Sequence, residues 1–233
     1  MLQRGTIVQV DGLGRALVLT KTSWNLAMHG VGVVPAVPHT TASPTATIDP
    51  WDDQRAFDPT RIVVVPQRAA QEIVAVTTDT LLHSIERGLA ELVQARRLLD
   101  TPPKLTRPPA GRVDYPRWGD IYYINAAATT ERKRYVVVSF DEWNAARKTA
   151  LVVRLTSRQK QSDAQFPVVA DGSSRACCGE VTAVSAAAID QRARPHDTVS
   201  RLNLNDMVAI ARGITATHLL RDYLTESELL AAE

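Results

Sequence analysis

The sequence predicts a mostly β fold of the α+β class, in which a small domain occurs twice and each copy ends in a helix. Short runs rich in β-branched residues alternate with turn residues along the chain, as in antiparallel β proteins. Each half closes with a stretch whose apolar residues recur at helical spacing. Residues 134–144 (RYVVVSFDEWN) also repeat the pattern of residues 15–25 (RALVLTKTSWN): an arginine, four apolar residues, and a polar turn ending in Trp-Asn.

Three short matches in the same order support an internal duplication. The offset between the copies is 113 residues from Arg4 to Arg117, 119 from Trp24 to Trp143 and 125 from Arg87 to Arg212. An offset that grows along the chain is expected where loops are lengthened in one copy. Because each match is short, the inference rests on their collinear order.

In the first half we expect a hairpin of strands 5–10 and 16–20, then strands at 32–37, 61–65 and 71–76, and a helix over 80–99. Residues 38–60 contain four prolines and four aspartates, which predicts a long exposed loop. Four prolines between 102 and 109 predict a semi-rigid linker at 101–114, so that the domains are 1–100 and 115–233.

In the second half we expect the same order of elements. The predicted strands are 119–125, 135–139, 149–155, 166–170 and 176–184, followed by a helix over 205–220. Thr225-Glu226-Ser227-Glu228 forms a capping box, which predicts a short last helix.

Composition and charge narrow the class of protein. The formal charge of the 233 residues is +2, but residues 131–160 hold eight Lys or Arg against three acids. A polyanion is therefore expected to prefer the second half, while a solvated strand edge is the alternative reading of the same charge. The two cysteines are adjacent, the five histidines lack metal-ligand spacing, and no apolar run has the length of a membrane span. These features predict a soluble cytoplasmic protein without a metal or cofactor.

Candidate functional residues lie in this basic region. Arg134 stands where a charged cluster meets an apolar strand, so its guanidinium could clamp a phosphate. Thr156 and Ser157 end the next strand, and their hydroxyls could hold a phosphate oxygen, although such residues often only close a turn. Glu180 lies in an apolar strand, where it either faces solvent or pairs with a base such as Arg134.

The second half resembles the MazF/PemK family of bacterial toxin endoribonucleases. Three segments carry the resemblance. Residues 117–122 (RWGDIY) are similar to the opening Arg-Gly-Asp-Ile-Tyr, residues 134–138 (RYVVV) to the Arg-Pro-Val-Leu-Val strand, and residues 151–157 (LVVRLTS) to the strand ending in Thr-Ser. Glu180 matches an acidic position of the last long strand.

This resemblance implies an SH3-like small β-barrel with a C-terminal helix, and a metal-independent endoribonuclease of a type II toxin–antitoxin system. The enzyme would cleave single-stranded RNA by attack of the 2′-hydroxyl, leaving a cyclic phosphate and a 5′-hydroxyl. The catalytic residues implied are Arg134, which protonates the leaving oxygen or stabilises the phosphorane, and Thr156. The implied substrate contacts are Glu131, Lys133, Ser157, Arg158 and Glu180. The partners implied are RNA and a small acidic antitoxin.

The first half resembles the same family more weakly. Arg15 keeps the arginine, while the threonine position falls at or beside Pro38 and the acidic position at Pro66, so this copy is expected to be degenerate. The chain would then act as a monomeric, single-chain pseudo-dimer. The acidic residues 46–56 could lie in the protein's own basic groove and inhibit it. A catalytically inactive barrel pair that binds nucleic acid or protein is the alternative function.

Overall fold

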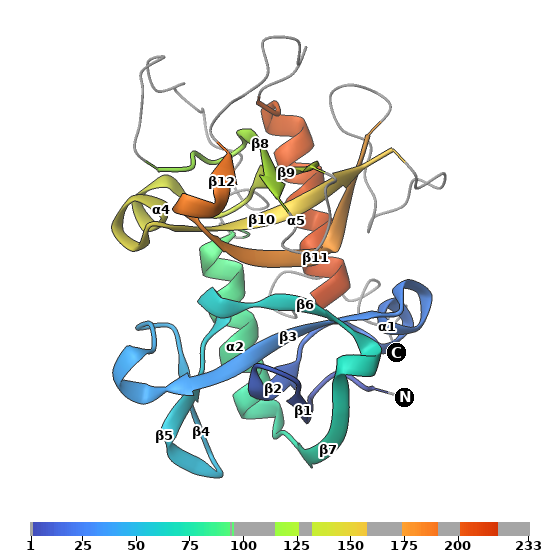
Figure 1. Cartoon of the computed structure of the whole chain (residues 1–233), viewed down its shortest axis with the longest axis vertical. Helices are drawn as coiled ribbons and strands as arrows, with labels where there is room; N and C mark the ends of the chain where they lie inside the picture. The colour runs from blue at the N-terminus through green and yellow to red at the C-terminus, as the bar shows by residue number, and fades with distance from the viewer. Residues whose placement is uncertain are drawn as a thin grey trace. The chain divides into compact units, whose positions relative to one another are not determined.

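The structure is a computed structural model of the chain (Figure 1). It describes residues 2–93, 95, 115–125, 132–157, 174–190 and 201–218. Contacts divide these residues into two compact units. The first unit is built from 1–91, 179–182 and the chain from Thr215, and the second from 92–178 and 183–214, as far as these ranges are described. Residues 101–114 lie outside the described residues, so the domain boundary stays a prediction.

The first unit contains an antiparallel sheet with strand order β4-β5-β3-β2-β1-β7, in which β6 also pairs with β3. β1 and β2 form the predicted hairpin, whose turn uses Gly12 and Gly14 at positive φ. Alternate residues of β1, β2 and β3, among them Val8, Val18 and Val33, form a fully buried core. The strands are β1 (Thr6–Val10), β2 (Gly14–Val18), β3 (Gly30–Pro38), β4 (Thr47–Asp49), β5 (Asp52–Phe57), β6 (Val63–Pro66) and β7 (Ala70–Val76).

Two helices accompany this sheet, α1 (Thr22–Met28) and α2 (Asp79–Leu92). The predicted apolar stripe of α2 is buried, with Ile85 and Leu89 fully inaccessible. Gly88 permits close packing of α2, because a Cβ there would lie 2.9 Å from Pro59 Cγ.

The prediction of an exposed loop at residues 38–60 is wrong. This segment contains the β4–β5 hairpin and two 3-10 turns, η1 (His39–Thr41) and η2 (Pro59–Arg61). One of the aspartates that suggested a loop has its partners inside the structure. The buried Asp58 accepts hydrogen bonds from Ser43 N, Ser43 Oγ, Thr60 N and Thr60 Oγ1 at 2.6 to 3.0 Å.

The second unit contains a sheet with strand order β11-β10-β9-β8-β12. Its strands are β8 (Ile121–Asn125), β9 (Arg132–Val137), β10 (Thr149–Thr156), β11 (Arg175–Ser185) and β12 (Ile189–Asp190). Its helices are α4 (Asp141–Arg147) and α5 (Leu204–His218), and η4 (Ala186–Ala188) is a 3-10 turn. The predicted segments 166–170 and 225–228 lie outside the described residues.

The polar turns predicted to carry Trp-Asn are short helices, α1 and α4. Each ends in a left-handed residue, His29 or Lys148, both at φ 51°. The asparagine of each pair is fully buried, so its amide bonds protein groups and fixes the strand-to-helix connection. The mostly β, α+β prediction is confirmed: curled antiparallel sheets carry helices at their C-terminal ends.

The described residues contain neither a membrane-crossing helix nor a cluster of metal-binding side chains. In that part of the chain, none of the helices combines the length and hydropathy that a bilayer crossing requires. The same residues contain no group of three or more His, Cys, Asp or Glu side chains placed to bind a metal ion.

Candidate active site around Arg134

Arg134 lies in the middle of the sheet of the second unit. On β9 it pairs with Tyr123 of β8 on one side and with Leu155 of β10 on the other. Its side chain is half-buried, and its Nη2 donates a hydrogen bond to Ser174 Oγ at 2.5 Å. Three neighbouring strands and the residue preceding β11 therefore determine where this guanidinium lies.

Ser174 is a site residue that the sequence analysis missed. It is fully buried and lies 40 residues from Arg134 in the chain. No local pattern marks it, because only the strand order brings the start of β11 near β9. The one available signal was a polar Ser-Ser pair immediately before an apolar strand.

Thr156 and Lys133 lie on the sheet face opposite to that of Arg134. The register pairs Arg134 with Leu155, so Thr156 follows one residue later, and successive side chains of a strand alternate between faces. Lys133 pairs with Ile124 and precedes Arg134. Thr156 is half-buried at the end of β10, and Ser157 is exposed just beyond it.

The remaining predicted substrate contacts are placed only in part. Glu131 and Arg158 lie outside the described residues. Glu180 lies on β11, half-buried, in the Gly179–Thr182 segment that clusters with the first unit. The pairing of Glu180 with Arg134 therefore remains an expectation.

Two further arginines lie on β10 and β11, which follow β9 in the strand order of the sheet. Arg154 on β10 pairs with Tyr135 of β9, and its Nη2 contacts Cys177 Sγ at 3.8 Å. Arg175 begins β11, and its buried Nε and Nη1 have no hydrogen-bond partner among the described residues. Strand alternation places Arg175, Cys177 and Arg154 on one face. The strands around Arg134 thus carry cationic groups on both faces.

A polar cluster holds the start of β8 in the second unit. Arg201 Nε donates to Asp120, and the Tyr122 hydroxyl donates to Asp120 Oδ2 at 3.3 Å. Burial raises the pKa of Tyr122 to about 12, and the charge of Asp120 adds to this effect. Burial also raises the pKa of Asp141, although the Trp118 N–H, which donates to it at 2.6 Å, acts in the opposite direction. These groups position the strand that lies beside Arg134.

The first unit repeats the hydrogen bonds that connect β9 with α4 and β10 in the second unit. Thr20 Oγ1 donates to Asn25 Oδ1 at 2.5 Å and accepts from Gly32 N at 3.0 Å. In the second unit Ser139 Oγ donates to Asn144 Oδ1 at 2.5 Å and accepts from Leu151 N at 2.8 Å. Each of the three residues in the second unit lies 119 positions after the equivalent residue of the first unit.

Backbone hydrogen bonds just before the first strand of each unit give the offset between the units at that strand. Gly5 N donates to Val18 O and Gly119 N to Val137 O, both at 2.9 Å, so the offset at the first strand is 114. The sequence match of Arg4 with Arg117 is therefore one residue out of register, and the counterpart of Arg4 is Trp118.

Equivalent backbone hydrogen bonds also give the offset at the helices and at the position of Glu180. Leu82 N donates to Thr78 O and Met207 N to Asn203 O, which gives 125 at the helices, as expected from sequence. Gln67 N donates to His29 O and Ala186 N to Lys148 O, an offset of 119. The counterpart of Glu180 is therefore Arg61; the assignment of that position to Pro66 is wrong.

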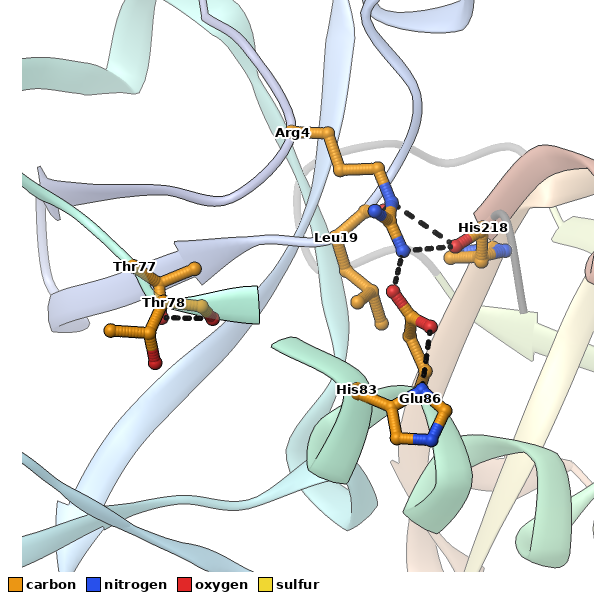
Figure 2. A network of polar contacts seen from close by, with 7 residues as sticks. All are labelled: Arg4, Leu19, Thr77, Thr78, His83, Glu86 and His218. Carbon is orange, nitrogen blue, oxygen red and sulfur yellow. Dashed lines mark hydrogen bonds and ion pairs between the residues drawn. The ribbon is translucent and has the colours of Figure 1, made fainter. Parts of the chain in front are cut away.

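A second polar network lies in the first unit and is drawn in Figure 2. The Arg4 guanidinium forms a buried ion pair with Glu86 of α2. It also donates to Leu19 O at 3.1 Å and to His218 O, at the last residue of α5, at 3.1 Å. A cation at the end of a helix satisfies carbonyls that have no partner within the helix. Glu86 Oε2 lies 3.8 Å from His83 Nδ1.

The second unit thus combines an antiparallel sheet, a C-terminal helix and an arginine anchored on the second strand of that sheet. Residues 117–217 match the model of a family described as "PemK-like, MazF-like toxin of type II toxin-antitoxin system". This segment runs from the residues before β8 to the end of α5, which is less than half of the chain. It is a domain of the PemK/MazF toxin family.

Solved structures similar to the chain include three crystal forms of MazE-MazF from Deinococcus radiodurans. Forms II, I and III are 18%, 16% and 16% identical to it, with TM-scores of 0.34, 0.35 and 0.34. Each match covers 39% of this chain and 92%, 92% and 93% of the respective solved chain. A search among curated proteins found no significant match.

Proposed function

We propose that the second unit is a toxin-type endoribonuclease that cleaves single-stranded RNA, such as mRNA, without a metal ion. One observation carries the proposal: within the segment that matches the toxin family, the guanidinium of Arg134 is half-buried and anchored by Ser174 Oγ. A guanidinium fixed in this way matches the geometry of a phosphate and stabilises negative charge that develops on it.

In the proposed reaction the 2′-oxygen of a ribose attacks the adjacent phosphorus, and the bond from phosphorus to the 5′-oxygen breaks. The 2′-hydroxyl loses its proton and the departing 5′-oxygen gains one, so the products are a cyclic phosphate and a 5′-hydroxyl. Because an arginine side chain stays protonated in proteins, we assign Arg134 to stabilisation of the phosphorane charge. Fixed donors of this kind supply a large share of the rate enhancement in many enzymes.

The other residues are assigned as contacts along the RNA strand. Since Thr156 shares a sheet face with Lys133 and Arg154, we propose that its hydroxyl positions a phosphate next to the one that Arg134 holds. Ser157 is exposed at the same strand end and is proposed to bind the substrate. Glu131, Arg158 and Glu180 remain proposed substrate contacts on the strength of the resemblance.

We also propose that the two units arose by duplication, so that one chain acts as a monomeric pseudo-dimer. The repeated bonds around Asn25 and Asn144 support this origin. A small acidic antitoxin protein is the proposed partner, because an acidic segment complements the arginines of β9, β10 and β11.

The proposal is tested by incubating the full chain with a long single-stranded RNA in EDTA and identifying the ends of the products. We expect cleavage to persist in EDTA and to leave 5′-hydroxyl and cyclic phosphate ends. An Arg134→Ala protein purified in parallel controls for contaminating nuclease. Loss of cleavage in EDTA, or products with 5′-phosphates, would reject the mechanism.

A second candidate function is an inactive barrel pair that binds RNA or protein. The observation that favours it is the register, which places Thr156 and Arg134 on opposite faces of the sheet. RNA that stays intact at high protein concentration, together with tight RNA binding that depends on Arg134, would support this function instead of cleavage.

A further inference from the structure

Arg15 of the first unit occupies the same structural position as Arg134 of the second. Arg15 pairs with Gln9 on the first strand, as Arg134 pairs with Tyr123, and these pairs agree with the offsets of 119 and 114. On the other side, Ala16 and Leu17 pair with Pro35 and Val34, while their counterparts Tyr135 and Val136 pair with Arg154 and Val153. The equivalence therefore holds on both flanking strands.

The two arginines have different partners. Arg134 donates to the hydroxyl of Ser174, which carries no charge. Arg15 Nη1 lies 3.4 Å from Oδ2 of Asp49, a carboxylate whose side chain is completely inaccessible to solvent. The position that meets a neutral group in the second unit thus meets an anion in the first.

The carboxylate is supplied by the β4–β5 hairpin. β5 pairs with the end of β3, from Ala36 to Pro38, and β4 pairs with β5. Asp49 ends β4, and its Oδ1 accepts a hydrogen bond from Trp51 N at 3.0 Å across the tip of the hairpin. This local bond holds the carboxylate in the orientation that faces Arg15.

The ion pair leaves one buried atom of each side chain without a hydrogen bond. Arg15 Nε and Asp49 Oδ2 are both buried and lack hydrogen-bond partners among the described residues. A phosphate presents more oxygens than a carboxylate to a guanidinium and forms two parallel hydrogen bonds with it. The buried donor of Arg15 is therefore suited to a ligand larger than the one it meets.

We propose that the first unit contains a latent phosphate-binding site at Arg15, which the β4–β5 hairpin closes by placing Asp49 where an RNA phosphate would bind. The site binds without cleaving, since Val37, the counterpart of Thr156, carries no hydroxyl. The proposal rests on the proposed function only for the choice of RNA as ligand.

The test measures RNA binding in a chain that cannot cleave. In an Arg134→Gln background, Asp49→Asn is compared with its parent by fluorescence anisotropy of a short labelled single-stranded RNA over a range of salt concentrations. We expect about fivefold tighter binding, as for one gained charge-assisted contact. The dependence of log affinity on log salt should steepen by about 0.7, the value for one extra phosphate contact on a single strand.

Asp53→Asn is the matched control, because Asp53 is exposed on the same hairpin and its replacement changes the net charge equally. An equal gain for Asp53→Asn, or a gain that survives Arg15→Gln in the same chain, would overturn the proposal. Absence of cleavage by the unmodified protein would reject the proposed function and leave this binding comparison intact.

A second measurement covers the case in which Asp49→Asn does not fold. If the site is closed, Arg15→Gln in the Arg134→Gln background leaves RNA affinity unchanged, because Arg15 is not exposed to the RNA. A loss of affinity of about fivefold or more from Arg15→Gln would show that Arg15 already binds RNA, and the proposal would then be wrong.

Discussion

The first and second units share the hydrogen-bonded connection between their second and third strands, but the central arginine meets a different group in each unit. Both use a buried asparagine, a hydroxyl residue and a left-handed helix end to connect the second strand to the third. They differ at the central arginine, which meets Ser174 in one unit and Asp49 in the other. The comparison therefore separates a repeated hydrogen-bonded framework from the group that meets the central arginine.

A second difference concerns the contact, within each unit, between the residue before the first strand and the helix that ends the unit. In the first unit Arg4 and Glu86 form a buried ion pair. Their counterparts by the offsets of 114 and 125 are Trp118 and Ala211, which line a small apolar recess together with Met207 and Ile210. The same position is thus filled by electrostatic pairing in one unit and by apolar packing in the other.

The largest expected effect comes from replacing the two equivalent arginines. We expect Arg134→Ala to reduce RNA cleavage about 10²- to 10³-fold, because the charge developing on the phosphate loses its fixed donor. Arg15→Ala should leave cleavage unchanged, because the Arg15 guanidinium already forms an ion pair with Asp49. Initial rates of cleavage of one RNA measure both, and circular dichroism shows whether each protein is folded.

Equal losses from Arg134→Ala and Arg15→Ala would contradict this asymmetry between the units. Arg134→Lys separates charge from geometry, since lysine retains the positive charge but cannot form two parallel hydrogen bonds. We expect it to recover little activity.

The buried ion pair provides the next largest effect. We expect Glu86→Ala to lower the free energy of unfolding by about 3–5 kcal/mol, because the Arg4 side chain, only 10% exposed, then lacks its carboxylate. Arg4→Trp combined with Glu86→Ala copies the pair of the second unit and should be more stable than Glu86→Ala alone. Urea unfolding followed by fluorescence and circular dichroism measures this difference.

A cost below about 1 kcal/mol for Glu86→Ala would show that the pair is screened by solvent and does not act as a buried interaction. Exposed Glu91→Ala on the same helix is the control for loss of a negative charge.

Much of the fold was predictable because strand and helix periodicity is local. The β1–β2 hairpin, the stripe of α2 and the order of the two halves all follow from patterns within about 20 residues. The β4–β5 hairpin was not predicted, because prolines and aspartates are typical of loops when their partners are unknown. Asp58 accepts a hydrogen bond from Ser43, 15 residues away, and Asp49 forms an ion pair with Arg15; neither partner can be recognised from spacing.

Only part of the candidate site was predictable from the sequence. Arg134 was found because a basic residue before an apolar strand is a local signal. Ser174 was missed because its contact with Arg134 spans 40 residues and depends on the strand order of the whole sheet. The expected cooperation of Arg134 and Thr156 overlooked the register, since a shift of one residue moves a side chain to the other face of a sheet.

A smaller effect is expected at the shared framework. Asn25→Ala and Asn144→Ala each leave a buried hydroxyl without its acceptor and buried carbonyls without their donor, so each should cost about 2–3 kcal/mol. The comparison predicts equal costs in the two units, measured by urea unfolding. Asn205→Ala, at an exposed position of α5, should change stability by less than about 0.5 kcal/mol. Clearly unequal costs would mean that the repeated bonds do not support the two units alike.

The smallest effect concerns Asp141, whose counterpart by the offset of 119 is Thr22. Each accepts a hydrogen bond from the backbone N–H of an equivalent residue, Trp118 at 2.6 Å and Arg4 at 3.4 Å. Burial raises the pKa of Asp141 above its ordinary value of 3.8, so the folded state holds this proton more tightly than the unfolded state.

The contribution of Asp141 to stability is therefore present below pH 3.8 and is lost as the pH rises through the higher pKa of the folded state. Asp141→Thr copies the uncharged acceptor of the first unit, so it should gain stability relative to the unmodified chain between pH 3 and pH 7. We expect less than about 1 kcal/mol, because solvent screens a half-exposed carboxylate. Urea midpoints measured across that range test this, with Thr22→Ser as the neutral control. A relative loss with rising pH would mean that the bond from Trp118 outweighs burial, and that the charge at Asp141 stabilises the second unit in a way that the first unit does without.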